Sequence, residues 1–478
     1  MTALPLRRGW CPGARRPMET GDGLLVRVHP PGGSLSAVQA RALAEAAEAC
    51  GNGLLDVTAR GNLQIRGVNE VTHRAVLERL SGIALLEAAE DGPYRLTLVS
   101  PLAGIDPAEA FDAAALAAGI EARVGDVASA LPAKFFVAID GGGALRLEPG
   151  ADVWVAPAEG GVAIGLAVED GYVWYGPVPL ETAAETVAAA LVAFREKRGD
   201  ARRMRDISPD AAGMIATAMA HATPLSFPVG EGGTGGAGDG WGAARSDAFR
   251  AAETAVSGLA PSTSASPNAR PARPIRLGSA EPPSPTGKEN YVAGFITESA
   301  LLLALPFGRA TAAQLRLAAG WAEAHGAGEI RLSFTRGILI PHLGLAAADV
   351  VARAAEAAGF VTDPADPRLA LVACPGAPAC GRGNTPAPQD ALTLADAVRD
   401  LAEAGARIHV SACPKGCAHP RASDLTLVGR ADGRYDVIPG GAAGDAPMTA
   451  LPLPAVAGVL RHTSDPRGLA AAFGDHRT

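Results

Sequence analysis

The sequence predicts an internally duplicated α+β protein, and three observations lead to this prediction. A series of strand, turn, helix and strand near the N-terminus returns later in the 478-residue chain. A segment rich in Gly, Ser, Pro and Thr, residues 230–289, separates the two copies. Four of the six cysteines gather in residues 374–417, within the second copy. We therefore expect two related halves, of which one carries a metal centre.

The first copy begins with a strand over residues 24–29 and a helix over residues 35–50, for which Ser34 is the expected N-cap. A turn at residues 51–53 leads into a long strand over residues 54–66. This order of elements is a strand-helix-strand unit.

The second copy repeats this series at a constant shift, which places Pro30 on Pro306 and Arg60 on Arg336 without a gap. Its expected elements are a strand over 301–305, a helix over 311–325 and a strand over 329–340. The segment that joins the copies, residues 230–289, has few large apolar residues and is expected to be a flexible linker.

The cysteines form two close pairs, C-x5-C at Cys374 and Cys380 and C-x3-C at Cys413 and Cys417. Both pairs can face one small volume only if the chain between them folds back, and residues 391–404 are expected to form the returning helix. Four thiolates suit an iron–sulfur cluster or zinc. Structural zinc usually takes tighter hairpins, so the spacing favours a cluster over zinc, disulfides or unligated structural cysteines.

A period of two along the strand over 54–66 places five polar side chains on one face, two of them arginine. They are Thr58, Arg60, Asn62, Gln64 and Arg66. A solvated strand face is the simpler explanation, but the twin strand keeps Arg336 at the matched position. Two such arginines would converge near the duplication axis, where planar guanidinium groups bind carboxylates well. The pattern predicts an anionic ligand.

Lys134 is a second candidate for the same cavity. A similar shift overlays residues 134–140 on residues 407–413, so Lys134 begins the twin of the strand that leads into Cys413. An isolated lysine is more often a surface residue.

Net charge and the distribution of apolar residues exclude some classes of protein. The net charge of −8 argues against a general nucleic-acid binder. No apolar run approaches the length of a membrane span, and the basic N-terminus lacks the apolar segment of a secretory signal. The expected compartment is the cytoplasm, where thiols stay reduced.

These features together resemble the sulfite and nitrite reductase superfamily. Its members pair C-x5-C with C-x3-C around a 4Fe-4S cluster, and their tetrapyrrole-binding strand is similar to residues 58–67 here. The resemblance covers nearly the whole chain outside the linker and implies two ferredoxin-like half-repeats forming one domain, with two α/β domains beside it. The implied boundaries are an N-terminal arm (1–20), half-repeat 1 (21–90), α/β domain 1 without a cluster (91–229), the linker (230–289), half-repeat 2 (290–350) and α/β domain 2 with the cluster (351–478).

The resemblance leaves two enzymes open. The assimilatory sulfite and nitrite reductases carry sirohaem and bind the oxyanion with a Lys-x-Lys pair, of which Lys134 matches the first member while Phe136 replaces the second. Residues 16–27, 101–107 and 413–420 look more like the oxygen-dependent branch of aerobic cobalamin (vitamin B12) synthesis. That branch implies an oxidoreductase, a monooxygenase that hydroxylates precorrin-3A at carbon C20 and closes a γ-lactone. It uses O2 and an NADH-linked or ferredoxin-type electron donor.

The preferred interpretation is this oxygenase. It assigns Lys134 as catalytic, the four cysteines as cluster ligands, and a set of substrate-binding residues, namely Arg60, Asn62, Gln64, Arg66 and Arg336. A mononuclear non-haem iron would activate oxygen, since a thiolate-saturated cluster is a poor oxygenation site. The sequence does not identify the ligands of this iron; the histidines nearest to the proposed core are His342, His409 and His419. A non-enzymatic electron carrier is a further alternative, and it predicts no large anionic cavity.

Overall fold

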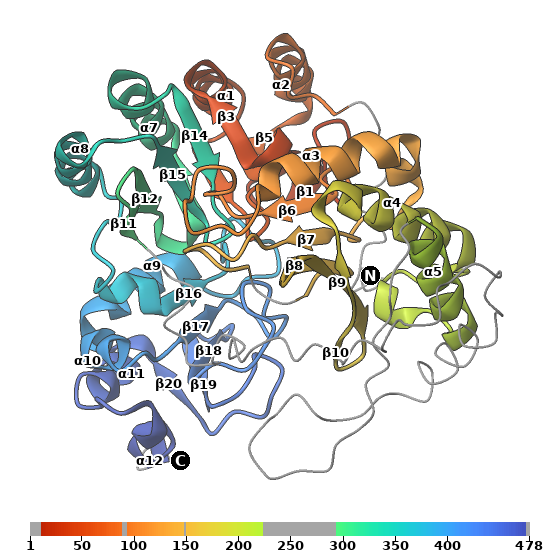
Figure 1. Ribbon diagram of the computed structural model, residues 1–478. Helices are drawn as coiled ribbons and strands as arrows, with labels where there is room; N and C mark the ends of the chain where they lie inside the picture. The colour runs from red at the N-terminus through yellow and green to blue at the C-terminus, as the bar shows by residue number, and fades with distance from the viewer. Residues whose placement is uncertain (1–10, 88–92, 148–149, 223–292, 475–478) are drawn as a thin grey trace, which may run out of the picture. The chain divides into compact units, whose positions relative to one another are not determined.

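The computed structural model describes residues 11–87, 93–147, 150–222 and 293–474 (Figure 1). The chain divides into two compact units, which we describe separately. The larger unit consists of Pro12–Ala88 and Glu281–Thr478, and the smaller unit of Met1–Cys11 and Ala89–Ala280. The expected linker at 230–289 lies outside the described residues.

The expected α+β class is confirmed by the four five-stranded sheets that the described residues form together with helices. Two of these sheets belong to the half-repeats of the larger unit. The first contains β1 (Met18–Thr20), β2 (Gly23–Val28), β5 (Leu63–Val68), β4 (Leu54–Val57) and β13 (Arg309–Thr311), in that order. The second contains β11 (Gly294–Thr297), β12 (Ala300–Ala304), β15 (Gly337–Pro341), β14 (Glu329–Leu332) and β3 (Ser34–Ser36).

The two half-repeats exchange an edge strand. Strand β13 comes from the second copy but pairs with β4 of the first, while β3 comes from the first copy and pairs with β14 of the second. Each exchanged strand precedes a helix, so neither half-repeat completes its sheet alone. The sequence predicted helix from residue 35, but residues 34–36 are extended because they form this edge strand, and Ser36 is the N-cap.

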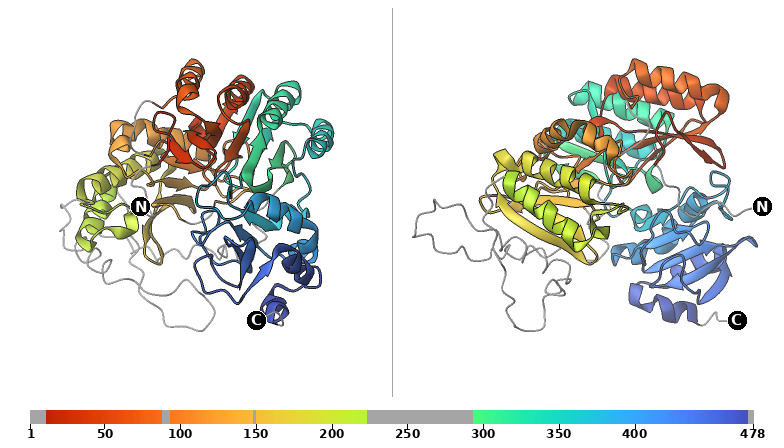
Figure 2. Two further views of the ribbon diagram at one scale, coloured as in Figure 1. Left: turned by 180° about the vertical axis from the view of Figure 1, so that it is seen from behind. Right: turned by 90° about the vertical axis from the view of Figure 1, so that its right-hand side faces the viewer.

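The described parts of the half-repeats contain four helices: α1 (Ala37–Cys50), α2 (Glu70–Gly82), α7 (Ala312–His325) and α8 (Leu345–Ala357). Helices α1 and α7 lie side by side and bury alanine and leucine between them (Figures 1 and 2). Two reciprocal ion pairs link them, Arg41 with Glu323 at 2.9 Å and Arg316 with Glu48. Each pair joins one helix to the other, as a pseudo-two-fold relation requires.

The duplication is visible in the backbone, but its register differs from the predicted one by a single position. Helix α1 begins at Ala37 and α7 at Ala312, and the ion pairs match Arg41 with Arg316 and Glu48 with Glu323. The shift that relates these residues is one position shorter than the shift that places Pro30 on Pro306. Gly61, at a φ of 60°, therefore corresponds to Arg336, at a φ of 66°. The predicted equivalence of Arg60 and Arg336 is wrong.

The long strand predicted over residues 54–66 is a β-hairpin. Strands β4 and β5 are joined by a tight turn in which Thr58 N donates to Asn62 O at 2.9 Å and Gly61 N donates to Thr58 O at 2.9 Å. The strand predicted over 329–340 is interrupted in the same way, with Ser333 N donating to Gly337 O at 2.9 Å. The chain reverses at this turn, but the pairs Val57↔Leu63 and Asp56↔Gln64 keep Gln64 and Arg66 on the face opposite the buried Leu63 and Ile65.

The remaining two sheets share one topology. In the larger unit the sheet contains β16 (Leu371–Ala373), β17 (Ile408–Ser411), β18 (Leu425–Gly429), β19 (Arg434–Pro439) and β20 (Thr449–Pro452). In the smaller unit it contains β6 (Thr97–Val99), β7 (Val137–Ile139), β8 (Val153–Ala158), β9 (Gly161–Val168) and β10 (Gly171–Val178). In each sheet the first three strands are parallel and the last two are antiparallel additions.

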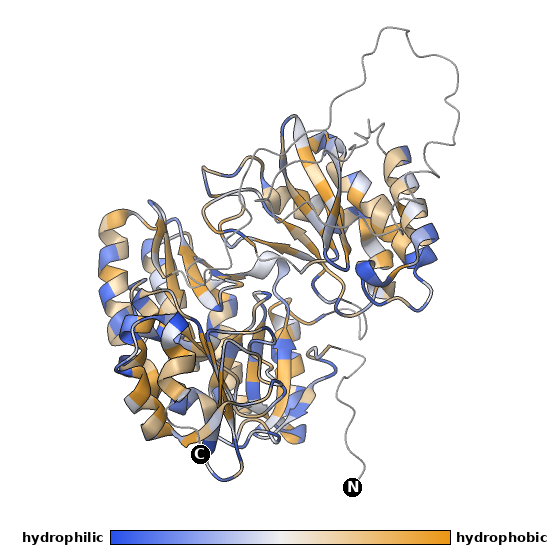
Figure 3. Ribbon diagram, turned by 90° about the horizontal axis from the view of Figure 1, so that it is seen from below, coloured by the Kyte–Doolittle hydropathy of each residue, from blue (hydrophilic) through white to orange (hydrophobic). Residues whose placement is uncertain are grey.

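Helices cover these two sheets as well. They are α3 (Ala113–Val124), α4 (Leu180–Lys197) and α5 (Pro209–Ala222) in the smaller unit, and α9 (Ala387–Leu394), α10 (Arg399–Glu403), α11 (Leu453–Leu460) and α12 (Leu469–Gly474) in the larger. The cores are rich in Ala, Val and Leu. Figure 3 shows hydrophobic residues, in orange, on both the strands and the helices. Within the described ranges, no helix combines the length and apolar character needed to cross a bilayer.

Candidate functional site

The four cysteines lie on two loops at one edge of the β16–β20 sheet. We call residues 374–380 the first cysteine arm and residues 413–417 the second cysteine arm. The first arm follows β16 directly, and the second follows β17 after one residue. Strands β16 and β17 are parallel neighbours, so both arms leave the sheet at the same edge. The returning helix is present as α9 and α10, joined by a short 3-10 segment.

The thiols are free and electrostatically coupled. Burial raises the pKa of the Cys374 thiol, and negative charge on Cys413 and Cys380 adds to the effect. Burial also raises the pKa of Cys417, and the other three arm cysteines contribute in the same direction. Cys374 Sγ accepts a hydrogen bond from Ala412 N at 3.2 Å, which favours the thiolate. A bound cationic centre would deprotonate such thiols outright.

The arms fit a 4Fe-4S cluster by their donor set and close backbone packing. A Cβ added to Gly376 would lie 2.6 Å from Ala387 N, and one added to Gly383 would lie 2.8 Å from Ala377 N. Across the described ranges, no three His, Cys, Asp or Glu side chains converge on a single ion. A 4Fe-4S cluster does not require that convergence, because each thiolate binds a different iron. A mononuclear iron does require it, so the described residues do not fit the second iron expected from the sequence.

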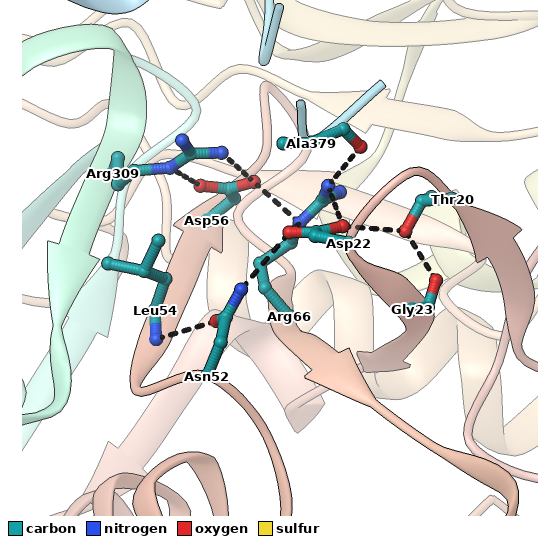
Figure 4. Close-up of polar contacts among 9 residues, drawn as sticks. All are labelled: Thr20, Asp22, Gly23, Asn52, Leu54, Asp56, Arg66, Arg309 and Ala379. Atoms are coloured by element: carbon teal, nitrogen blue, oxygen red, sulfur yellow. Dashed lines mark hydrogen bonds and ion pairs between the residues drawn. The ribbon is translucent and has the colours of Figure 1, made fainter. Parts of the chain in front are cut away.

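Arg66 is held inside the larger unit by protein groups (Figure 4). It is 2% exposed, and its Nη2 lies 2.6 Å from Asp22 Oδ1 while its Nε lies 3.2 Å from Asp22 Oδ2. The same Nη2 donates to Ala379 O at 2.9 Å, and Nε lies 3.8 Å from Asp56 Oδ2. Asp56 is also bound by Arg309 at 2.7 Å. The guanidinium predicted to bind a ligand carboxylate thus binds protein carboxylates, and its substrate role stays a prediction.

The other residues of the predicted polar face are divided between the hairpin turn and strand β5. Arg60 is half-buried in the turn, and Asn62 is 5% exposed directly before β5. The Asn62 side-chain oxygen is buried and has no hydrogen-bond partner among the described residues. The Gln64 side-chain oxygen accepts from Arg27 Nε at 2.9 Å across the β2–β5 pair. Gln64 shares its face of β5 with Arg66, and the substrate roles of Arg60, Asn62 and Gln64 stay predictions.

Arg336 lies in the hairpin turn of the second half-repeat and reaches the second cysteine arm. Its Nη2 donates to Ala418 O at 3.1 Å, directly after Cys417. It also lines a small, open recess together with Phe307 and Arg368. A Cβ on Gly308 would lie 2.9 Å from the Cβ of Arg336, so glycine at 308 makes room for this side chain.

His409 is a site residue whose importance the sequence did not reveal. It lies on β17, is 0% exposed, and both its ring nitrogens lack a hydrogen-bond partner in the described part of the chain. Its ring centroid is 6.0 Å from that of His419. Burial lowers the pKa of His409 to about 4, assisted by positive charge on His419 and Arg336. His342, in contrast, is exposed. Only tertiary packing distinguishes these histidines, so spacing alone gave no signal.

Lys134 belongs to the smaller unit. It is exposed in the loop before β7, while Phe136 is 8% exposed and lies within that unit. A position of Lys134 beside the arginines of the larger unit stays a prediction. Phe136 is buried and, as a phenyl ring, supplies no polar group in the place of the second lysine of the reductases.

Comparisons with known proteins agree with the duplicated fold. The model of the nitrite/sulfite reductase ferredoxin-like half domain matches twice, at residues 16–82 and 297–358. The solved structure of the Mycobacterium tuberculosis NirA protein superposes with a TM-score of 0.63 at 19% identity, covering 95% of this chain and 85% of that one. This similarity shows the fold.

Sequence relatives cover most of the chain. Precorrin-3B synthase from Sinorhizobium sp. is 30% identical over 453 residues, which is 93% of this chain and 86% of the relative. Ferredoxin–nitrite reductase from Synechococcus elongatus is 27% identical over 468 residues, which is 90% of this chain and 82% of the relative. The chain therefore belongs to the sulfite and nitrite reductase superfamily, which also includes precorrin-3B synthase.

Proposed function

We propose that this chain is a precorrin-3B synthase, a monooxygenase that converts precorrin-3A to precorrin-3B. The reaction hydroxylates carbon C20 of the macrocycle and closes a γ-lactone, using O2 and an electron donor that is NADH-linked or ferredoxin-type. The observation that carries the proposal is the similarity to the Sinorhizobium precorrin-3B synthase over 93% of the chain. The free arm thiols suit a reducing compartment, so we expect the enzyme in the cytoplasm.

In this proposal the two cysteine arms hold a 4Fe-4S cluster through Cys374, Cys380, Cys413 and Cys417. When bound, such a cluster supplies one-electron transfer. The protein contributes four thiolates at one end of the sheet. The Ala412 N–H supports the Cys374 thiolate by a 3.2 Å hydrogen bond. The proposal does not include the mononuclear non-haem iron expected from the sequence, because no three ligating side chains converge in the described ranges.

The proposed substrate is a metal-free tetrapyrrole that carries many carboxylates. Arg336 lines the small recess and reaches the residue after the second arm, and it is the foremost candidate to bind one of them, because a guanidinium matches a carboxylate with two parallel hydrogen bonds. Arg60, Asn62 and Gln64 are further candidates on the first hairpin. Lys134 is proposed to neutralise another carboxylate or to face the oxygen.

The second candidate is a sirohaem-dependent nitrite or sulfite reductase. It is supported by the 27% identity to the Synechococcus nitrite reductase over 90% of the chain. The buried Phe136 argues against it, because a site that gathers charge around a small oxyanion would lose a cation at this position.

Analysis of anaerobically purified protein tests both candidates. We expect iron and acid-labile sulfide at four or more irons to four sulfides. No sirohaem should be extracted, and precorrin-3A should be converted to precorrin-3B when O2 and a reductant are supplied. Extractable sirohaem together with ferredoxin-dependent reduction of nitrite or sulfite would overturn the proposal and establish the reductase.

A further inference from the structure

Two arginines, one from each half-repeat, each donate to the backbone of one cysteine arm. Arg66 on β5 donates to Ala379 O at 2.9 Å, one residue before Cys380 (Figure 4). Arg336 in the second hairpin turn donates to Ala418 O at 3.1 Å, one residue after Cys417. Each half-repeat thus contacts a different arm through a charged side chain.

The duplication does not produce this arrangement. In the observed register, which aligns α1 with α7, Arg66 corresponds to Pro341 and Arg336 corresponds to Gly61. The two contacts therefore arise from unrelated positions in the two copies. Inheritance of one arginine from a common ancestral half therefore does not explain why both contacts are present.

The Arg66 contact is built into a buried ion network. Burying a guanidinium is costly unless carboxylates and hydrogen bonds compensate. Asp22 supplies two contacts to it, and Gly21 N donates to the same carbonyl oxygen of Ala379 at 3.1 Å. A Cβ at Gly21 would overlap the Pro378 carbonyl oxygen and lie 2.8 Å from Gly381 N. The turn that carries Asp22 therefore packs directly on the first arm.

The Arg336 contact is kept at a cost to the backbone. A left-handed φ of 66° is unfavourable for any residue with a Cβ, and the first copy has glycine at the equivalent position. Arginine at 336 thus carries a strain that glycine would relieve. Such strain persists where the side chain has a use, and here the side chain reaches Ala418 O.

We propose that Arg66 and Arg336 act as a pair of clamps that position the two cysteine arms, and that Arg336 also places positive charge beside the iron–sulfur centre. The inference rests on the proposed function, because it requires the arms to hold a cluster. Reduction adds negative charge to a cluster, so a nearby cation favours the reduced form. Both arginines are positioning residues, and they link the half-repeats to the electron-transferring centre.

The test compares Arg336→Gly with wild-type protein, because glycine occupies the twin position and the variant should fold. Cluster loss under a chelator and the midpoint potential of the cluster, from an EPR-monitored redox titration, are the readouts. We expect cluster loss to be roughly tenfold faster, since one charge-assisted hydrogen bond is removed. We also expect the potential to shift to a more negative value, while the thermal midpoint Tm stays unchanged or rises.

Arg66→Lys provides the second variant, since it keeps the charge but loses the fork that spans Asp22 and Ala379. We expect faster cluster loss with a smaller shift of potential than in Arg336→Gly. The control is Arg74→Gln, which removes an exposed arginine from the same unit. Wild-type potential and loss rate in both clamp variants would overturn the clamp inference. Wild-type protein without iron and sulfide would instead overturn the proposed cofactor.

Discussion

At the scale of single residues, the protonation state of a side chain near the site depends on the residues packed around it. His409 illustrates this, because it is fully buried and neither ring nitrogen has a partner among the described residues. An orphaned buried polar atom costs about 1–3 kcal/mol. Charging the ring would cost more, since His419 and Arg336 already place positive charge nearby. The ring is therefore held neutral in the folded protein.

This neutrality predicts a pH dependence of stability. The pKa of His409 falls from 6.5 to about 4 on folding, so the unfolded chain binds a proton in the window between these values while the folded chain does not. Stability is then fully present above pH 6.5 and declines as pH falls toward 4, by about 3 kcal/mol in all. The free energy of urea unfolding of His409→Leu should be less sensitive to pH across that window. The exposed His325→Gln is the control, and equal pH slopes in all three proteins would contradict the assignment.

Gly21 offers a second prediction at this scale. Its missing side chain lets the turn before β2 touch the first cysteine arm, where a Cβ would overlap the Pro378 carbonyl oxygen. Gly21→Ala should lower the free energy of unfolding by about 1–3 kcal/mol, because the turn and the arm must separate. Gly82→Ala is the matched control, since nothing lies within 4 Å of the added Cβ in helix α2. Chemical denaturation of both variants checks this, and equal stabilities would show that the contact is dispensable.

At the scale of elements, the sequence was most reliable where a local signal exists. Helices α1 and α7, the returning helix and the strand before Cys413 were predicted because alanine runs and apolar runs are local signals, although the predicted N-cap Ser34 is two residues before the observed Ser36. The strand over 54–66 failed because its alternation continued across Gly61 and Asn62, although both residue types favour turns. The error of a single position in the register then paired the wrong arginines. Neither the exchanged edge strands nor the Asp22 partner of Arg66 has a signature in local sequence.

The exchanged strand β13 yields a prediction about Asp56. This carboxylate on β4 binds Arg309 of β13 at 2.7 Å and lies 3.8 Å from the buried Arg66. Asp56→Asn should destabilise the protein by about 3 kcal/mol, since two poorly exposed guanidinium groups lose a counter-charge. Urea unfolding gives the measurement, with Glu78→Gln in an exposed ion pair as control at about 0.5 kcal/mol or less. A loss as small as that of the control would mean that water or Asp22 replaces the carboxylate.

At the scale of the whole chain, the separation of the two copies is visible in their loops. Both copies keep an α/β sheet with the same strand order, but cysteine arms follow the strands of only one of these sheets. The loops at the corresponding strand ends of the smaller unit carry Asp106 and Asp140, whose oxygens accept backbone N–H groups. These loops are closed by hydrogen bonds of the protein itself. All four proposed cluster ligands therefore lie in the larger unit.

That separation leads to a prediction about the cysteines. Cys417→Ser should abolish the visible absorbance of the cluster and lower bound iron and sulfide several-fold, because a neutral hydroxyl does not replace a thiolate on iron. Cys11→Ser is the matched control, since Cys11 lies outside the arms and a hydroxyl can also donate to its partner, Ala133 O. Iron, acid-labile sulfide and absorbance are measured on both variants after anaerobic purification. Unchanged iron and sulfide in Cys417→Ser would remove the second arm from the cluster, whereas losses in both variants would point to general instability of the fold.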